Sequence, residues 1–325
     1  MNIELLLRRL GHAFLVVFIV SLVAFAMGDL VGDPVASILG IDAPPEAREA
    51  LRTQLGLDQP FVLRYVDYVW GAIGGDLGMS YQAQRPVSEV LAERLPATAE
   101  LAVAAMGLSL AIGIPLGVIA AIWRETWWAS MLMTGSIIGV SLPTFVVGIL
   151  LIFVFSVHLG WLPSFGRGDT VSVGGWETGL LTVSGLKALI MPAISLAISQ
   201  VALVARLVRA EMLEVLRADF IRFARARGIA DRTVNFVHAL RNTLIPIITV
   251  TGIQLGYLVA FAVVVEQVFQ WPGLGTLFLG ALTQSDIPVI TAFLVLVAFF
   301  FAMTNLLVDL LYALADPRVR LTGKA

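Results

Sequence analysis

Residues 206–246 read RLVRAEMLEVLRADFIRFARARGIADRTVNFVHALRNTLIP and form a charged segment between two long apolar runs. The segment carries eight of the chain's 21 Lys and Arg residues. Because positive charge near membrane-spanning segments resists translocation, a basic loop of this length is expected on the cytoplasmic side. The sequence therefore predicts that this loop faces the cell interior, and the remaining segments can be oriented from it.

The composition is that of an integral membrane protein. Hydrophobic residues make up 58% of the chain and charged residues 14%, with a mean hydropathy of +0.91, whereas soluble domains carry about 25% charged residues. The absence of cysteine excludes disulfides, thiolate nucleophiles and Cys-ligated metal sites. Membrane topology explains the basic loop, so no nucleic-acid partner is expected.

Six apolar stretches are long enough to cross the roughly 30 Å hydrocarbon core of a bilayer as helices. The expected fold is an all-α membrane protein with spans at Leu10–Val31, Leu101–Trp123, Ser130–Val157, Leu186–Leu207, Leu244–Phe269 and Val289–Leu314. If both termini are cytoplasmic, the inner segments hold 14 Lys and Arg residues and the outer segments hold seven. This asymmetry agrees with the positive-inside rule and favours six spans with both ends inside.

The spans divide the chain into four parts. These are residues 1–31 with the first span, an outer polar insertion at 32–98, the other five spans at 99–314 and a cytoplasmic tail at 315–325. In the insertion, helices are predicted at 45–56 and 60–73, and a third begins after Arg85-Pro86. Two interpretations of the insertion stay open, a cap that covers the bundle or a docking surface for an external partner.

Glycine and proline mark positions inside the spans. Three pairs have the small-xxx-small spacing that lets membrane helices approach closely, and we interpret them as packing positions. The pairs are Gly113–Gly117, Gly135–Gly139 and Gly252–Gly256. Pro115 is expected to break the second span, and Pro143 to kink the third.

Polar residues form a stripe on the fifth span. Thr251, Gln254 and Tyr257 are spaced three apart, which places them on one face of a helix. This stripe could line a translocation path, or it could hold two helices together by hydrogen bonds. Both interpretations stay open.

Asp309 lies within the last span, about two turns from its cytoplasmic end. A carboxylate inside a membrane is costly and normally pairs with another group or faces water. Judged by depth, the nearest cations are Arg206 and Arg209, so a structural ion pair with one of them is predicted.

Catalytic and energy-coupling motifs are missing from the sequence. It contains no G-x-x-x-x-G-K-[ST] phosphate-binding loop and no H-E-x-x-H zinc motif. Glu266 and Asp309 lie toward the ends of their spans, whereas self-powered carriers usually hold ionisable groups near the midplane. The sequence therefore predicts a transport bundle whose energy comes from a subunit on another chain. A self-powered secondary carrier is the alternative.

The segment from Phe223 to Pro246 resembles the cytoplasmic coupling loop, or EAA loop, of permease subunits in bacterial ATP-binding-cassette (ABC) importers. It is closest to the "B" permeases of the dipeptide, oligopeptide and nickel branch. Other stretches agree with that branch in order, namely GLDQP at 56–60, GDLG at 75–78, RLPAT at 94–98, SLPTF at 141–145, GWLP at 160–163, EQVF at 266–269, WPGLG at 271–275 and DPR at 316–318. The loop departs from the general pattern at Arg222, its first glutamate position, and matches it at Ala224 and Gly228.

The resemblance implies a type I importer permease fold in the bacterial inner membrane and a defined set of partners. These are a homologous second permease, two ATPase subunits and a periplasmic or lipid-anchored substrate-binding protein. ATP and Mg²⁺ would bind to the ATPases, and no cofactor, metal or catalytic residue is expected in this chain. The implied cargo is a short peptide, with nickel, glutathione and oligosaccharides as alternatives.

The second half of the loop is expected to dock into an ATPase. Gly228 permits a sharp turn, and Asp231 is predicted to cap a short helix at Arg232–Leu240. The residues assigned to coupling are Arg222, Ala224, Arg227, Gly228, Asp231, Arg232, Val234, Phe236, Val237, Leu240 and Arg241. The alternative is that this amphipathic basic segment rests on anionic lipid headgroups.

Overall fold

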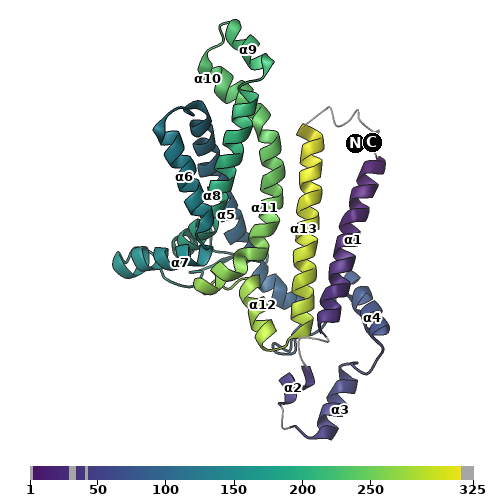
Figure 1. Ribbon diagram of the computed structural model, residues 1–325. Coiled ribbons are helices and arrows are strands. Elements are labelled where there is room, and N and C mark those ends of the chain that lie inside the picture. Colours follow the sequence, from purple (N-terminus) through teal and green to yellow (C-terminus); the bar gives the residue numbers. More distant parts are fainter. Residues whose placement is uncertain (1–2, 29–33, 41–42, 316–325) are drawn as a thin grey trace.

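The computed structural model describes residues 3–28, 34–40 and 43–315, and these are almost entirely helical (Figure 1). The elements in the first half are α1 (Ile3–Gly28), α2 (Pro34–Leu39), α3 (Pro45–Gln54), α4 (Phe61–Ile73), α5 (Val87–Ile122), α6 (Trp127–Ser141), α7 (Thr144–Leu151) and the π-helical η1 (Ile152–His158). Those in the second half are β1 (Val171–Val173), β2 (Trp176–Thr178), α8 (Val183–Val215), α9 (Asp219–Ala226), α10 (Asp231–Thr233), the π-helical η2 (Val234–Ala239), α11 (Leu240–Val268), α12 (Leu274–Thr283) and α13 (Ile287–Ala315). The predicted tail falls on residues 316–325, outside the described part of the chain.

Long apolar helices form the bundle. Within the described residues, α1, α5, α8, α11 and α13 are each long and apolar enough to cross a membrane, and the bent pair of α6 with α7 and η1 would make a sixth span. α9 and α10 lie at the end of the bundle where α1 begins, and α2, α3 and α12 lie at the opposite end (Figure 1). The basic loop and the start of the chain therefore share one end of the bundle.

The third predicted span consists of two helices rather than one kinked helix. α6 and the α7–η1 segment meet at an angle of 100°, and Leu142 between them is extended, with φ −81° and ψ 124°. Leu142 is followed by Pro143. A proline ring disfavours the helical conformation of the residue before it, which explains the extended backbone of Leu142. The expectation of one kinked helix over Ser130–Val157 was therefore wrong.

The second predicted span is longer and more regular than expected. α5 runs unbroken for 36 residues and contains both Pro96 and Pro115. The helix thus joins the third insertion helix to the membrane span, and the predicted break at Pro115 is not found. Proline is tolerated inside membrane helices because neighbouring groups satisfy the freed carbonyl, and Pro96 is itself buried.

Two connecting segments hold elements that the sequence analysis did not predict. Residues 171–178 form an antiparallel hairpin in which Val171 pairs with Thr178. The segment between α11 and α13 contains the ten-residue helix α12. The two insertion helices predicted at 45–56 and 60–73 are confirmed as α3 and α4.

The centre of the bundle is the packing of α5 against α8, with α11 against both. Its core holds fully buried Leu101, Met191 and Trp271, with many alanines between them. α11 also packs against α13, which packs against α1 (Figure 1). The small side chains let the helix axes approach, as expected for packing inside a bilayer.

The glycine pairs differ in what they contact. A Cβ added at Gly117 would lie 2.6 Å from both the Ala205 carbonyl oxygen and the Val208 Cβ of α8, and one at Gly252 would overlap Val308 of α13. A Cβ at Gly135 would meet nothing within 4 Å. Close packing is therefore confirmed at Gly117 and Gly252, and the packing interpretation of Gly135 was wrong for the described residues.

We expect Gly117→Ala to lower the stability of the bundle by about 1–3 kcal/mol, because an added methyl group there forces backbone to move. Gly135→Ala is the matched control, since both glycines are helical and only one is crowded. It is expected to be neutral or stabilising by up to about 1 kcal/mol through helix propensity. Thermal unfolding in detergent micelles, followed by tryptophan fluorescence, measures both. Equal midpoints for the two variants would contradict the close α5–α8 approach.

Candidate functional site

The basic loop is a folded unit rather than an open connection. Ile221 and Ala224 on α9 are buried against Val234 and Ala239 of η2, in an apolar cluster that includes Val208 of α8. α9 therefore uses one face to hold the loop against the ends of α8 and α11. Its other face stays exposed.

Gly228 closes α9 as the sequence predicted. Its φ is +77°, a left-handed conformation that glycine adopts without strain. The Gly228 N–H donates to the Arg225 carbonyl at 2.9 Å, and the Ile229 N–H donates to the Ala224 carbonyl at 3.2 Å. This pair of bonds is a Schellman motif, which satisfies the last carbonyls of a helix and reverses the chain.

The helix after this turn differs from the prediction. Ala230 occupies the cap position without a side-chain bond, and Asp231 is the first helical residue. Asp231 instead forms an ion pair with Arg225 at 3.3 Å, across the turn. The expected separate helix Arg232–Leu240 is not found, because α10 continues through η2 directly into α11.

The predicted apolar docking face is only half exposed. Val234 is fully buried, so it is not available to a partner, whereas Leu240 is partly buried against the same cluster. Phe236 and Val237 are 51% and 53% exposed. Inclusion of Val234 was wrong, because the sequence pattern alone did not show that the loop folds back onto α8.

Two further aromatic residues of the loop are exposed and were not predicted as docking residues. Phe220 is 49% exposed and Phe223 is 64% exposed, both on α9. The Arg227 guanidinium lies over the Phe223 ring, 5.7 Å from its centroid. The alternation of these residues with buried Ile221 and Ala224 is an amphipathic signal that could have identified them.

A cavity of about 760 Å³ lies between the turn after α5 and the basic loop. Arginines line it from both sides, namely Arg124, Arg217, Arg222 and Arg225. Of these, Arg222 pairs with Asp219 and Arg225 with Asp231. The loop surface is thus basic around an exposed apolar patch.

The polar stripe on α11 has an interhelical contact. The Gln254 side-chain amide donates to Gln200 Oε1 of α8 at 2.9 Å. Thr251 is half-buried, and the exposed ring of Tyr257 contacts Phe301 of α13 edge to face at 6.2 Å. Gln254 therefore joins two helices, as one of the two open interpretations expected.

Asp309 pairs with Arg9 of α1, not with Arg206 or Arg209. Arg209 instead donates from Nε to the Ala120 carbonyl at 3.3 Å. The prediction of the partner was wrong because it used depth alone, whereas α13 packs against α1. The expectation that Asp309 pairs with a cation is confirmed.

A buried hydrogen-bond network at the opposite end was missed. Glu266 is fully buried near the end of α11. Thr98 Oγ1 of α5 donates to one of its carboxyl oxygens at 2.6 Å, and the Thr276 N–H of α12 donates to the other at 3.0 Å. Thr98 Oγ1 also accepts the Leu274 N–H at 2.8 Å. One carboxylate therefore ties three helices together.

Close packing surrounds this carboxylate. The Trp271 indole N–H donates to the Ala97 carbonyl at 2.9 Å, and Trp271 is 1% exposed. A Cβ at Gly273 would overlap Glu266 Oε1, so only glycine fits there. The signal in the sequence was Glu266 itself, since a carboxylate in an apolar run needs donors. The sequence spacing did not show that one of these donors is Thr98 of α5.

Two more buried carboxylates hold connecting segments at the same end of the bundle. Glu100 of α5 accepts hydrogen bonds from Arg167 at 2.8 and 3.2 Å, and from the Gly179 N–H at 3.2 Å. Asp286, just before α13, accepts from Ser80 Oγ at 2.6 Å and from the Tyr81 N–H at 3.1 Å. The hairpin and the end of the insertion are thereby fixed to the bundle.

In the part of the chain that the structure describes, no group of three or more His, Asp or Glu side chains is placed to hold a metal ion. The candidate functional residues gather at the two ends of the bundle. A basic, partly apolar loop lies at one end of α8 and α11, and a network of buried carboxylates lies at the other.

Comparisons with known proteins identify the family of this chain. Residues 113–321 match the family described as binding-protein-dependent transport system inner membrane component, and residues 2–102 match the N-terminal model of such components. A Brucella melitensis protein, named as a candidate peptide transport system permease, is 41% identical over 98% of this chain and 99% of its own length. The glutathione transport system permease protein GsiC of Escherichia coli K12 is 38% identical over 97% of this chain and 98% of its own length.

A solved structure shows the same fold. A chain of the inward-facing MetNI methionine ABC transporter superposes with a TM-score of 0.56 at 18% identity, covering 70% of this chain and 96% of that one. Systems of this family work with ATPase and binding-protein partners, and the ATPases bind the ATP. The chain therefore belongs to the binding-protein-dependent transport system inner membrane components, as a multi-pass permease subunit of a bacterial ABC importer and not its ATPase.

Proposed function

We propose that this permease forms half of the translocation path of an importer for short peptides, paired with a homologous second permease. Two of its relatives carry names of peptide and glutathione systems, and glutathione is itself a tripeptide. These names favour peptides over nickel or oligosaccharides. In the proposed topology six spans cross the inner membrane with both termini in the cytoplasm, and the insertion at 32–98 lies outside, toward the binding protein.

The importer would contain two ATPase subunits, one docked on each permease. In this chain the basic loop is the proposed contact for its ATPase. The observation that carries this proposal is the exposure of Phe220, Phe223, Phe236 and Val237 on a folded loop surrounded by arginines. Aromatic residues and arginine are the types that dominate the energy of protein interfaces. Since the loop joins α8 to α11 without a disordered stretch, force applied there reaches both helices.

In this proposal Thr251 and Tyr257 line the path, while Gln254 holds α11 to α8 through Gln200. The exposed ring of Tyr257 and the half-buried Thr251 are consistent with a surface that meets a second permease or the cargo. Membrane lipid covers the remaining apolar faces of the bundle.

Reconstitution separates this function from a secondary carrier. The chain would be purified together with its second permease, its ATPases and its binding protein, and reconstituted in liposomes. We expect uptake of a radiolabelled dipeptide that requires ATP and the binding protein and is insensitive to a proton gradient. Uptake by the purified chain alone, driven by an ion gradient, would overturn the proposal.

A further inference from the structure

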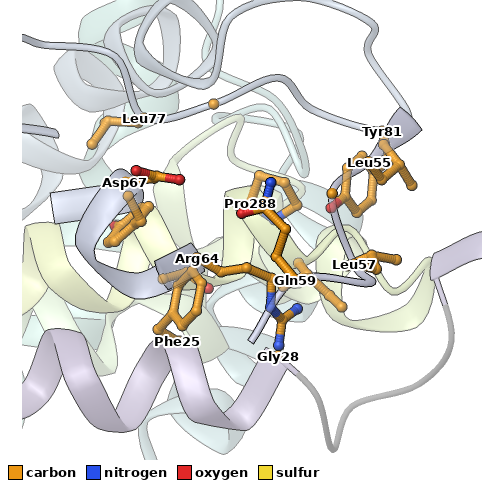
Figure 2. A pocket seen from close by; sticks show the side chains of 15 residues that line it. Phe25, Gly28, Leu55, Leu57, Gln59, Arg64, Asp67, Leu77, Tyr81 and Pro288 are labelled. Carbon is orange, nitrogen blue, oxygen red and sulfur yellow. The ribbon is translucent and has the colours of Figure 1, made fainter. Parts of the chain in front are cut away.

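A pocket of about 290 Å³ lies at the outer end of the bundle, between the end of α1, the loop after α3, α4 and the start of α13 (Figure 2). None of the described residues that line it lies on α11, where Thr251 and Tyr257 are proposed to line the path. Its volume is near the lower limit of small-molecule sites.

The wall of the pocket combines apolar side chains with two opposite charges. Arg64 and Asp67 are three residues apart on α4, and both line the pocket. In Figure 2, Arg64 crosses the centre of the view, with Asp67 on one side and Leu55 and Leu57 on the other. A small molecule inside would therefore meet a cation, an anion and an apolar surface at once.

Two hydroxyls of the lining residues lack a partner. Tyr68 Oη and Thr291 Oγ1 are buried and make no hydrogen bond within the described residues. A buried hydroxyl without a partner costs about 1–3 kcal/mol, so such groups normally mark a bound water or ligand. Burial raises the pKa of Tyr68 to about 12, and its hydroxyl therefore stays a donor at neutral pH.

The pocket is held open by its surroundings. Asp286 fixes the segment that carries Tyr81, with Ser80 Oγ at 2.6 Å, and Tyr65 bonds Ser21 of α1 at 2.8 Å. A Cβ at Gly28 would lie 2.6 Å from the Ile287 side chain, so α1 and α13 touch at the base. These contacts are independent of any ligand, which indicates a preformed site.

We propose that this pocket binds a small zwitterion that carries an apolar group. Its anionic group faces Arg64, its ammonium group faces Asp67, the hydroxyls of Tyr68 and Thr291 complete its hydrogen bonds, and the apolar part contacts Leu55 and Leu57. Two sources share this chemistry, a short peptide in solution and the phosphoethanolamine headgroup of an outer-leaflet lipid. The site does not depend on the cargo of the transporter being a peptide.

Binding would be measured on the full-length purified chain by thermal stabilisation and calorimetry. One arm titrates Leu-Leu, with N-acetyl-Leu-Leu-amide as the uncharged control. The other compares nanodiscs containing phosphatidylethanolamine with nanodiscs of phosphatidylcholine only, whose quaternary ammonium cannot donate a hydrogen bond to Asp67. We expect one of the charged probes to stabilise the protein and its control to fail.

Tyr68→Phe and Thr291→Val remove the two hydroxyls with little change of shape. Each is expected to weaken the effective probe about tenfold, the equivalent of about 1.4 kcal/mol. Thr283→Val is the control, because its exposed hydroxyl bonds only the Gly280 carbonyl on α12. Stabilisation by Leu-Leu assigns a soluble ligand, and stabilisation by the ethanolamine lipid assigns the membrane.

The proposal is overturned if neither charged probe acts, or if both hydroxyl variants bind the probe as well as the unaltered chain. That outcome is expected of a pocket in which water alone satisfies the two hydroxyls.

Discussion

Replacement of Phe223 and Phe236 by aspartate is expected to abolish ATP-driven uptake while the permease itself stays folded. Both side chains are more than half exposed, so a charge there costs little stability in the free chain. In a docked complex the same charge would enter a desolvated contact with an ATPase. Loss of an interface anchor costs about 2–4 kcal/mol, which weakens association by about 30-fold to 1,000-fold for each residue.

The measurements are copurification of the ATPases and dipeptide uptake in liposomes, with the unfolding midpoint as the test of folding. Phe236→Leu keeps the apolar contact and should retain most of the uptake. A second variant, Arg232→Glu with Arg241→Glu, reverses two charges of the loop, and ATPase copurification in neutral detergent then tests docking in the absence of anionic lipid. Full ATPase copurification and full uptake in both the aspartate and the arginine variants would refute the coupling role of the loop.

Glu266→Ala is expected to destabilise the end of the bundle opposite the basic loop by about 3–5 kcal/mol. The change leaves the Thr98 hydroxyl and the Thr276 N–H without their acceptor, at about 1–3 kcal/mol for each buried group, and adds a cavity. Trp271, one of the chain's seven tryptophans, is packed beside this network, so the loss should change its share of the total fluorescence. The unfolding midpoint and the emission maximum of the purified chain measure the effect.

Glu125→Ala is the matched control for this prediction, since the Glu125 side chain is 86% exposed in the turn after α5. It should leave both signals unchanged. Thr98→Val should produce part of the loss, because it removes the bond from α5 and leaves the one that the Thr276 N–H donates. A free energy of unfolding for Glu266→Ala within about 1 kcal/mol of the control would show that the network does not stabilise the fold.

The long helices could be predicted because each depends on a local property, the run of apolar residues that a bilayer requires. The turn at Gly228 was predictable for a similar reason, since a left-handed residue between two helical segments calls for glycine. Both signals are contained in one continuous stretch of sequence. The fold class and the position of the basic loop followed from them.

Contacts between distant segments could not be predicted in the same way. Asp309 was assigned to the wrong arginine because depth in the membrane does not identify the neighbouring helix. Val234 was taken as exposed because the amphipathic pattern of its own helix gives no information about α9. The bonds from Thr98 to Glu266 link positions 168 residues apart, and one sequence holds no record of that pairing.

Proline showed a further limit. Pro143 ends a helix and redirects the chain by 100°, whereas Pro96 and Pro115 lie inside one continuous helix. The residue type is the same in all three places, so the outcome depends on whether neighbouring helices support the backbone. That support is a property of the assembled bundle.

α8 is a single helix that ends near the basic loop on one side and near the β1–β2 hairpin on the other. Its 33 residues correspond to about 50 Å at 1.5 Å per residue, so a tilt of about 10° around its middle moves each tip by roughly 4 Å in opposite directions. A displacement of the tip beside the basic loop would therefore move the tip beside the hairpin the opposite way. Under the proposed function, such a tilt would widen one end of the translocation path as it narrows the other, without any intermediate element.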